Sequence, residues 1–254
     1  DHRDLRDHPR RADVAHEDVS VSPQGLHALL DPRAAGVVDP HEGRTTLKRQ
    51  ILEAARAAGT GLSRRILITS PHADEGKTFC AVNLALSLAA ESDLEVVLID
   101  ADLANPSIKE VFGLPERAGL MDVLSDPDLP VEQQVLQTDI AGLWLLPPGR
   151  QGNHASEALA SRRTAEVFER LTAQAPNRIV LIDSPPALAA SPAAELAKHV
   201  GQTILIARAD RTGKSALEDA AQLLSACPDI KLVLNGANFS HDTSVYWDGT
   251  LVDT

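Results

Sequence analysis

Short, almost continuous apolar runs recur along the central part of the chain. They are found at 66–68, 96–99, 143–146, 179–182, 203–206 and 232–234. Runs of this length without polar alternation are typical of strands that are buried on both faces of a sheet. Most neighbouring runs are separated by segments with apolar residues at helical spacing, over 81–90, 165–173 and 215–226. This alternation predicts an α/β fold in which an open, mostly parallel sheet is flanked by helices.

The two ends of the chain lack these patterns. Residues 1–43 are rich in Asp, Arg, His and Pro, and we expect them to form a flexible N-terminal arm. An apolar stripe then predicts a helix over 44–58. Residues 239–254 are polar and show no clear period, which predicts a loose C-terminal tail. We therefore expect a single folded domain over 44–238.

Composition and charge narrow the class of protein. The 254 residues are 43% hydrophobic, which is enough for the core of one α/β domain. The formal net charge of −12 argues against a general nucleic-acid binder, because such a protein needs a basic face. Cys80 and Cys227 are too few for a disulfide framework or a zinc cluster. No run approaches the roughly 20 apolar residues that cross a bilayer. We expect a cytoplasmic protein that reaches a membrane only through a partner.

The strongest chemical signal follows the first apolar run. The strand over 66–68 enters a loop, and Gly76-Lys77-Thr78 then opens a helix, which is the context of a phosphate-binding loop. Backbone N–H groups at the helix start and the helix dipole favour a phosphate there. Lys77 is expected to reach the β- and γ-phosphates and Thr78 to bind Mg²⁺, so the motif predicts binding of Mg-ATP. The expected nucleotide-binding residues of this segment are Asp74, Glu75, Gly76, Lys77, Thr78 and Phe79.

Two residues of this loop depart from the usual glycine-rich pattern. Pro71 stands at the place of the first glycine and has no N–H to offer. Asp74 stands where many related loops have glycine and adds negative charge near the phosphates. Aspartate tolerates the left-handed backbone conformation better than most residues, so the loop is still expected to form. We expect weaker nucleotide binding as a result.

Three acidic residues follow two other strands. Asp100 and Asp102 follow the run over 96–99, and Asp183 follows the run over 179–182. Ligands of open α/β sheets bind at the carboxyl ends of the strands, and a strand-terminal Asp commonly holds Mg²⁺ through water. An isolated Asp-x-Asp also caps turns, but beside a phosphate-binding loop we favour the functional interpretation. The sequence shows no nucleophile elbow and no histidine pair at metal-binding spacing.

The order of these motifs resembles a known family. The phosphate-binding loop, Leu-Ile-Asp-Ala-Asp-Leu at 98–103, Asn-Pro-Ser at 105–107 and Leu-Ile-Asp-Ser-Pro-Pro at 181–186 are similar to bacterial tyrosine autokinases of exopolysaccharide biosynthesis. These kinases, of the exosortase-associated or capsular type, belong to the MinD/ParA-like P-loop ATPases. The resemblance covers roughly 44–238. His72 replaces a lysine that partition and septum ATPases carry, which favours the kinase branch.

The resemblance implies roles for individual residues. Asp102 and Asp183 would hold Mg²⁺ through water together with Thr78, and Asp100 would accept the proton of a tyrosine hydroxyl. The implied catalytic residues are Lys77, Asp100 and Asp102. Asn235 matches a position that often faces the adenine, although an ordinary turn residue fits the same place.

Other positions depart from the family pattern. Ala104 and Asn105 replace arginines, and Thr45 stands where the oligomerisation helix carries another arginine. The C-terminal tyrosine cluster is reduced to Tyr246, the only tyrosine of the chain. Tyr246 is either the sole phosphoacceptor or an incidental residue left after the cluster was lost, and we favour the acceptor.

The resemblance implies a non-specific protein-tyrosine kinase that uses ATP and Mg²⁺ to phosphorylate itself and regulates exopolysaccharide polymerisation or export. It also implies a homo-oligomer whose activator is a membrane chain-length-determinant protein, the polysaccharide co-polymerase. That partner would hold the chain at the inner membrane, and no nucleic acid is expected. The alternative is a MinD/ParA-like assembly ATPase that switches with its nucleotide and has no kinase activity. A third possibility is a scaffold that binds nucleotide without turnover.

Overall fold

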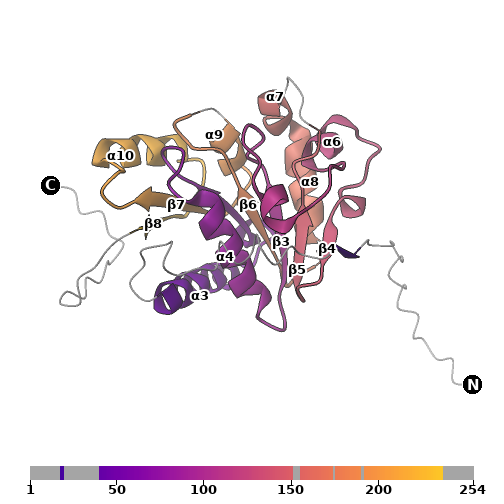
Figure 1. Cartoon of the computed structure of the whole chain (residues 1–254), viewed down its shortest axis with the longest axis horizontal. Coiled ribbons are helices and arrows are strands. Elements are labelled where there is room, and N and C mark those ends of the chain that lie inside the picture. The colour runs from indigo at the N-terminus through magenta and orange to yellow at the C-terminus, as the bar shows by residue number, and fades with distance from the viewer. Residues whose placement is uncertain (1–17, 20–39, 151–154, 174, 190–191, 237–254) are drawn as a thin grey trace, which may run out of the picture.

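A mixed sheet runs through the middle of the molecule, and helices lie on both sides of it (Figure 1). The computed structural model describes residues 18–19, 40–150, 155–173, 175–189 and 192–236. Within these residues the sheet has eight strands in the order β1-β4-β5-β3-β6-β2-β7-β8. All neighbouring strands are parallel except β4 and β5, which pair antiparallel. The predicted α/β fold with a mostly parallel sheet is confirmed.

The six predicted strands are all present. In chain order the strands are Asp18–Val19 (β1), Arg65–Thr69 (β2), Glu95–Asp100 (β3), Leu136–Thr138 (β4), Leu143–Leu146 (β5), Arg178–Asp183 (β6), Gln202–Arg208 (β7) and Ile230–Asn235 (β8). The two that the sequence analysis did not predict, β1 and β4, are the shortest. Of these, β1 lies within the predicted N-terminal arm and pairs with β4.

Alternate residues of the strands enter two separate cores. Along β3, Val96 and Leu98 pack with one cluster and Val97 and Ile99 pack with the other. Successive side chains of a strand point to opposite faces, so continuous apolar runs are what a sheet with two covered faces requires.

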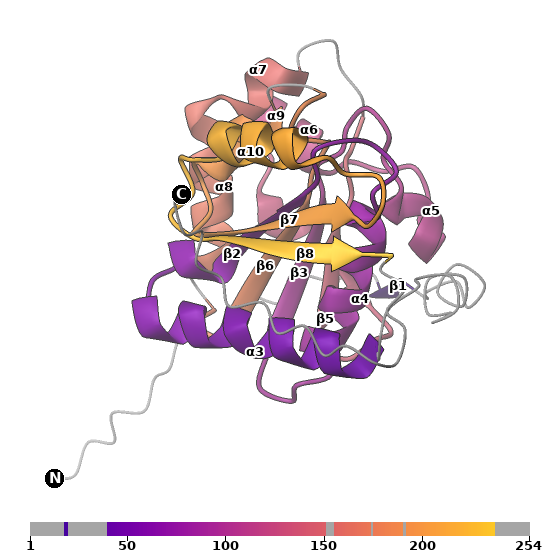
Figure 2. The ribbon, with the colours of Figure 1, turned by 90° about the vertical axis from the view of Figure 1, so that its left-hand side faces the viewer.

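The helices divide between these two faces (Figure 2). One face is covered by α3 (Pro40–Ala58), α4 (Lys77–Ala89) and α5 (Ile108–Phe112). The other is covered by α6 (Leu120–Ser125), α7 (Ala155–Leu159), α8 (Arg162–Ala173), α9 (Pro192–Ala197) and α10 (Lys214–Leu223). The helix predicted over 44–58 ends as expected and begins earlier, at Pro40. Proline is favoured at the first helical position because its missing N–H would have no helical partner there.

The strand order decides where the chemistry lies. Because β6 sits between β3 and β2, three strands that each lead into a polar motif lie side by side. In this parallel arrangement Asp100 of β3 pairs with Asp183 of β6 at the same level of the sheet. The motifs therefore meet at the carboxyl edge, as expected for an open α/β sheet.

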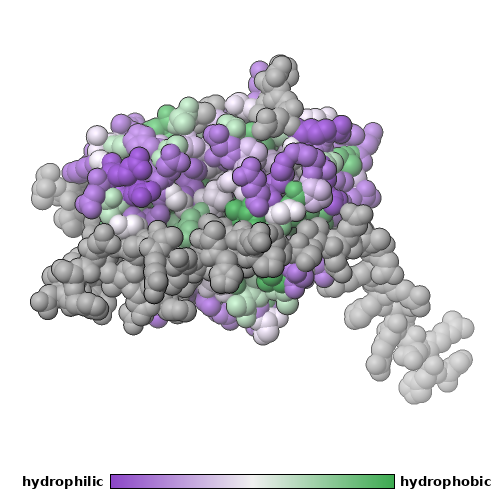
Figure 3. Space-filling model, viewed as in Figure 1, coloured by the Kyte–Doolittle hydropathy of each residue, from purple (hydrophilic) through white to green (hydrophobic). Residues whose placement is uncertain are grey.

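The coloured part of the surface in Figure 3 is mainly hydrophilic, with hydrophobic residues in small separate groups. None of the described helices is both long enough and apolar enough to span a bilayer. Cys80 and Cys227 are both free thiols. Burial and the nearby Asp183 raise the pKa of Cys80 to about 12, so its thiol stays protonated and unreactive at neutral pH.

Candidate functional site

The loop between β2 and α4 is tied to the rest of the sheet at both of its ends. On one side, the N–H groups of Ala187 and Leu188 donate to the carbonyls of Ser70 and Pro71 over 2.8 Å and 3.2 Å. On the other side, Gly76 precedes the first residue of α4 with a φ of 95°. A Cβ on Gly76 would lie 2.1 Å from Nδ2 of Asn235, so both the backbone angle and the space require glycine.

Hydrogen bonds inside the loop give it a fixed shape. The N–H of His72 donates to Oε2 of Glu75 over 2.8 Å, and the Ser70 hydroxyl donates to the His72 carbonyl over 2.6 Å. Asp74 takes a φ of 62°, the left-handed conformation that the sequence analysis expected an aspartate to tolerate. Nδ2 of Asn235 donates to the Glu75 carbonyl over 2.9 Å, so the last strand of the sheet also holds the loop.

Lys77 begins α4 and lies close to an acid in the loop that follows β3. Its Nζ lies 4.0 Å from Oδ2 of Asp102, and both side chains are almost completely buried. Burial raises the pKa of Asp102, while the ammonium of Lys77 acts in the opposite direction. A cation held here at the start of a helix favours a bound polyphosphate.

A chain of oxygen atoms lies next to this lysine. The Thr78 hydroxyl donates to Oδ2 of Asp183 over 2.6 Å and accepts from the Ser107 hydroxyl over 3.1 Å. Thr78 and Asp183 were predicted to belong to this site, whereas Ser107 was not. A serine that follows a proline in a loop has no distinctive pattern, so only the structure reveals this contact.

Two buried carboxylate oxygens at this edge of the sheet have no partner. Oδ2 of Asp100 accepts from the N–H of Ile108 over 3.0 Å. Among the described residues, Oδ1 of Asp100 and Oδ1 of Asp183 are buried without a hydrogen bond. Burial and the proximity of the other acids raise the pKa of Asp100 to about 8, and burial raises that of Asp183 to about 7. Because unpaired buried acceptors are rare, these atoms suggest a ligand that supplies positive charge or donors.

The donor set fits a hydrated magnesium ion. Carboxylate and hydroxyl oxygens are the ligands that Mg²⁺ takes, and Mg²⁺ keeps several waters when it binds to proteins. Among the described residues, no three His, Cys, Asp or Glu side chains converge closely enough to form a direct coordination shell. Contact through water, with one hydroxyl and two carboxylates, matches this arrangement.

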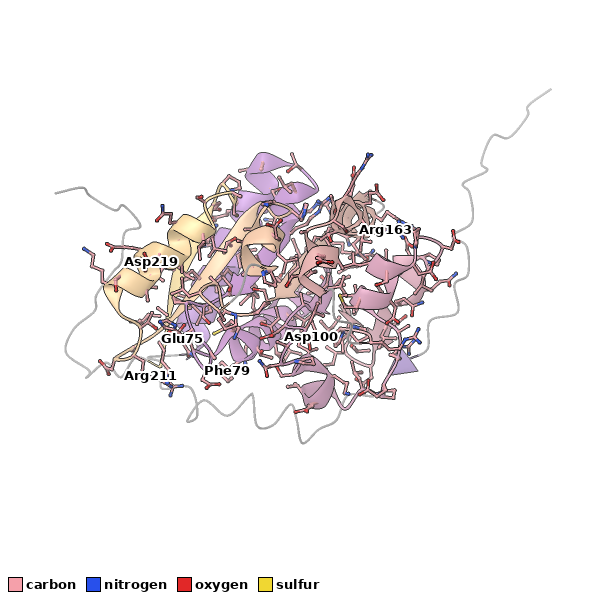
Figure 4. All side chains as sticks on the ribbon, turned by 90° about the horizontal axis from the view of Figure 1, so that it is seen from above. Glu75, Phe79, Asp100, Arg163, Arg211 and Asp219 are labelled. Carbon is pink, nitrogen blue, oxygen red and sulfur yellow. The ribbon has the colours of Figure 1, made fainter. Side chains whose placement is uncertain are left out.

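The predicted site residues are largely brought together. In Figure 4, Glu75, Phe79 and Asp100 lie in the lower half of the view, and Arg163 lies in the upper half. Phe79 is half-buried on the first turn of α4. Tyr246 and the rest of the predicted tail lie outside the described residues. Two further contacts to the loop, from Arg208 and Thr212, escaped the sequence analysis because polar residues of distant loops share no sequence pattern.

Comparison with known proteins agrees with this geometry. The ParA family model, described as NUBPL iron-transfer P-loop NTPase, matches residues 61–188. The chain is 29% identical over 247 residues to the putative tyrosine-protein kinase EpsB of Ralstonia solanacearum, covering 93% of this chain and 32% of EpsB. It is 30% identical over 190 residues to the tyrosine-protein kinase YwqD of Bacillus subtilis (strain 168), covering 74% of this chain and 78% of YwqD. The chain thus spans about a third of EpsB and most of YwqD.

Solved structures of kinase and ATPase proteins superpose on this chain. The kinase domain of the Escherichia coli tyrosine kinase ETK superposes with a TM-score of 0.63 at 28% identity, over 73% of this chain and 72% of that one. The septum site-determining protein MinD of Pyrococcus horikoshii OT3, in complex with Mg-ADP, superposes with a TM-score of 0.56 at 25% identity. That match covers 65% of this chain and 67% of MinD.

Proposed function

The chain belongs to the ParA-type P-loop NTPases, in the branch that holds the bacterial tyrosine-protein kinases, and on this premise we propose that it is an ATP-dependent protein-tyrosine kinase that phosphorylates itself. The observation that carries the proposal is the position of Asp100. Among the residues that the structure describes, one carboxylate oxygen of this buried acid has no partner, and it lies at the edge of the sheet where Lys77 and Thr78 also lie. A kinase needs such a base beside the phosphates, and relatives of this chain are named as tyrosine-protein kinases.

The proposed site assigns a task to each residue. The loop from Asp74 to Phe79 holds the phosphates of ATP, and Lys77 balances their charge. Thr78, Asp102 and Asp183 would hold Mg²⁺, which would supply further charge neutralisation to the phosphates. The incoming tyrosine oxygen bonds to the γ-phosphorus, the bond between that phosphorus and ADP breaks, and the phenolic proton passes to Asp100.

The raised pKa of Asp100 suits a base that accepts a proton only when Mg-ATP is bound. With its pKa raised to about 8, the carboxyl is largely protonated at neutral pH when no cation is near. A bound divalent cation favours the ionised form, because opposite charges lower the pKa of a carboxyl. Asp100 would therefore become a proton acceptor when Mg-ATP binds, and the empty site would keep it neutral.

The resemblance to the autokinase family supports proposals for the phosphoacceptor, the activating partner protein and the cellular location. We propose Tyr246 as the phosphoacceptor, since the chain has no other tyrosine. The proposed activator is a membrane chain-length-determinant protein, which would recruit a homo-oligomer of this chain to the cytoplasmic face of the inner membrane. The cycle of phosphorylation would regulate exopolysaccharide polymerisation or export.

Intact-mass spectrometry tests the kinase directly. The protein is incubated with Mg-ATP and a peptide from the cytoplasmic tail of the proposed activator, beside the Lys77→Ala and Tyr246→Phe variants. We expect one added phosphate on the wild-type chain and none on either variant. Absence of phosphate on a wild-type chain that still binds ATP would rule the kinase out.

A nucleotide-switched assembly ATPase is the second candidate. The likeness to MinD in complex with Mg-ADP, the single tyrosine of this sequence and the altered phosphate-binding loop favour it. This candidate predicts self-association that depends on ATP and persists in Tyr246→Phe. Light scattering of the wild type and this variant, with ATP and with ADP, separates the two functions.

A further inference from the structure

The end of β7 and the loop that follows it, from Arg208 to Thr212, make direct hydrogen bonds to the phosphate-binding loop and are called the supporting loop. Nη1 of Arg208 donates to the carbonyl of Asp74 over 3.0 Å. The hydroxyl of Thr212 donates to Oε1 of Glu75. These contacts join residues more than 130 positions apart in the chain, and they reach two consecutive residues of the phosphate-binding loop.

Both contacts fall at points where the phosphate-binding loop needs support. Asp74 holds a left-handed φ of 62° that glycine adopts freely and other residues adopt at a cost. Glu75 is almost completely buried, with 2% of its surface exposed, although it carries a carboxylate. A buried carboxylate requires hydrogen bonds, and those of Glu75 come from the His72 N–H and the Thr212 hydroxyl.

The supporting loop is itself held in one conformation. The Thr212 hydroxyl accepts from the N–H of Arg208 over 2.8 Å, and the N–H of Thr212 donates to the Arg208 carbonyl over 2.9 Å. Ala209 donates its N–H to the Asn235 carbonyl over 2.8 Å. The side chain of Asn235 in turn donates to the Glu75 carbonyl. Arg208 and Thr212 are therefore fixed before they reach the phosphate-binding loop.

We infer that Arg208 and Thr212 are positioning residues for nucleotide binding, which hold Asp74 and Glu75 so that the backbone N–H groups at the start of α4 converge on the phosphates. Side-chain hydrogen bonds from Arg208 and Thr212 stabilise the conformation of this loop, which more regular phosphate-binding loops adopt because they contain additional glycines. The inference rests on the nucleotide-binding part of the proposed function and is independent of phosphoryl transfer. A preorganised loop binds more tightly because less conformational freedom is lost on binding.

The hydroxyl of Thr212 is tested with two substitutions. Thr212→Val keeps the shape and removes the hydroxyl, and we expect the dissociation constant for Mg-ADP, measured by calorimetry, to rise about tenfold. Thr212→Ser keeps the hydroxyl, and its dissociation constant is expected to stay within about twofold of the wild type. Equal affinities of the wild type and Thr212→Val, or an equal loss in both variants, would overturn the role of this hydroxyl.

The role of Arg208 is tested with a double-mutant cycle. Arg208 is exposed, so Arg208→Ala is expected to fold, and it should raise the Mg-ADP dissociation constant about fivefold. Glycine adopts the left-handed conformation without support. In an Asp74→Gly protein, Arg208→Ala should therefore raise the Mg-ADP dissociation constant by less than about twofold. Equal effects of Arg208→Ala in both backgrounds would overturn the inference for this residue. If Thr212→Val does not fold, this double-mutant cycle still tests whether the supporting loop positions the phosphate-binding loop.

Lys214→Ala is the matched control for charge. Lys214 lies at the start of α10 and pairs with Glu218 over 3.5 Å on the exposed surface. Its removal takes one positive charge from the same region without breaking a contact to the phosphate-binding loop. Affinity losses of equal size in Lys214→Ala and Arg208→Ala would attribute the effect to charge alone and refute positioning. A wild-type chain that binds Mg-ADP but transfers no phosphate would refute the kinase and leave this inference standing.

Discussion

Asp100 and Asp183 pair with each other across adjacent parallel strands, and each buries one carboxylate oxygen that has no hydrogen-bond partner within the described part of the chain. Their proximity is one reason why the pKa of Asp100 is raised to about 8. Ionisation of these buried acids is therefore unfavourable in the empty site, where Asp100 stays largely protonated at neutral pH. A bound cation favours the ionised forms, so the protonation of these two acids links the stability of the fold to the occupancy of the site.

The first prediction concerns the pH dependence of stability without nucleotide. The folded-state pKa values of Asp100 and Asp183 are about 8 and about 7, above the ordinary value of about 3.8. Between these values the folded state binds more protons than the unfolded state, so the free energy of unfolding falls as pH rises. Calorimetry should show the melting temperature falling by at least about 2–4 °C, or about 1 kcal/mol, from about pH 5 to about pH 8.

Asp100→Asn provides the control for this pH effect. The amide cannot ionise, so this variant should lose less stability than the wild type over the same pH range. Saturating Mg-ADP should reduce the fall in the wild type as well, because the cation favours the ionised acids. A wild-type melting temperature that rises between about pH 5 and about pH 8, with that rise kept in Asp100→Asn, would contradict the assignment.

The second prediction separates catalysis from binding at Asp100. The carboxylate accepts from the Ile108 N–H and makes no described contact with the phosphate-binding loop. Asp100→Asn should therefore lower the single-turnover rate of phosphorylation by about 10²–10⁴-fold, the usual contribution of a general base. Its dissociation constant for ADP measured without Mg²⁺ should stay within about threefold of the wild type, as expected for a residue that does not hold the phosphates and acts mainly in the transition state. An unchanged rate would remove Asp100 from the proposed catalytic residues.

The third prediction concerns the hydroxyl of Thr78. Thr78→Val leaves Oδ2 of Asp183 and the hydroxyl of Ser107 without their present partner and removes a proposed ligand of Mg²⁺. We expect this variant to bind ADP with nearly the same affinity in Mg²⁺ and in a chelator, whereas the wild type binds more tightly with Mg²⁺. Thr78→Ser is the matched control and should keep the dependence on Mg²⁺. If Thr78→Val kept it too, the hydroxyl would not be a ligand.

The main strands could be predicted from their continuous apolar runs, and the acidic residues could be predicted because they end those runs. A strand covered on both faces must be apolar throughout, so β2, β3 and β6 stand out, and the polar residue that ends each one is conspicuous. The three-residue strand β4 exposes Gln137 between buried Leu136 and Thr138, a pattern too short to separate from a turn.

The contacts that hold the phosphate-binding loop were not predictable. Arg208 ends β7, and Thr212 lies in the polar segment after it, which has the sequence of an ordinary turn. Their partners, Asp74 and Glu75, are brought within reach only because β7 is the neighbour of β2 in the sheet. Local sequence patterns carry no information about which distant loop will face a given turn.

The fourth prediction decides between two interpretations of Asn235. The family resemblance places this residue at the adenine, whereas its amide donates to the Glu75 carbonyl and fills the space above Gly76. An amide used to hold the loop should affect all purine nucleotides alike. We therefore expect Asn235→Ala to raise the dissociation constants of Mg-ADP and Mg-GDP by the same factor, about fivefold. A loss confined to Mg-ADP would instead show that the side chain reads the base, because sites built to pair with one base reject others by leaving polar groups unpaired.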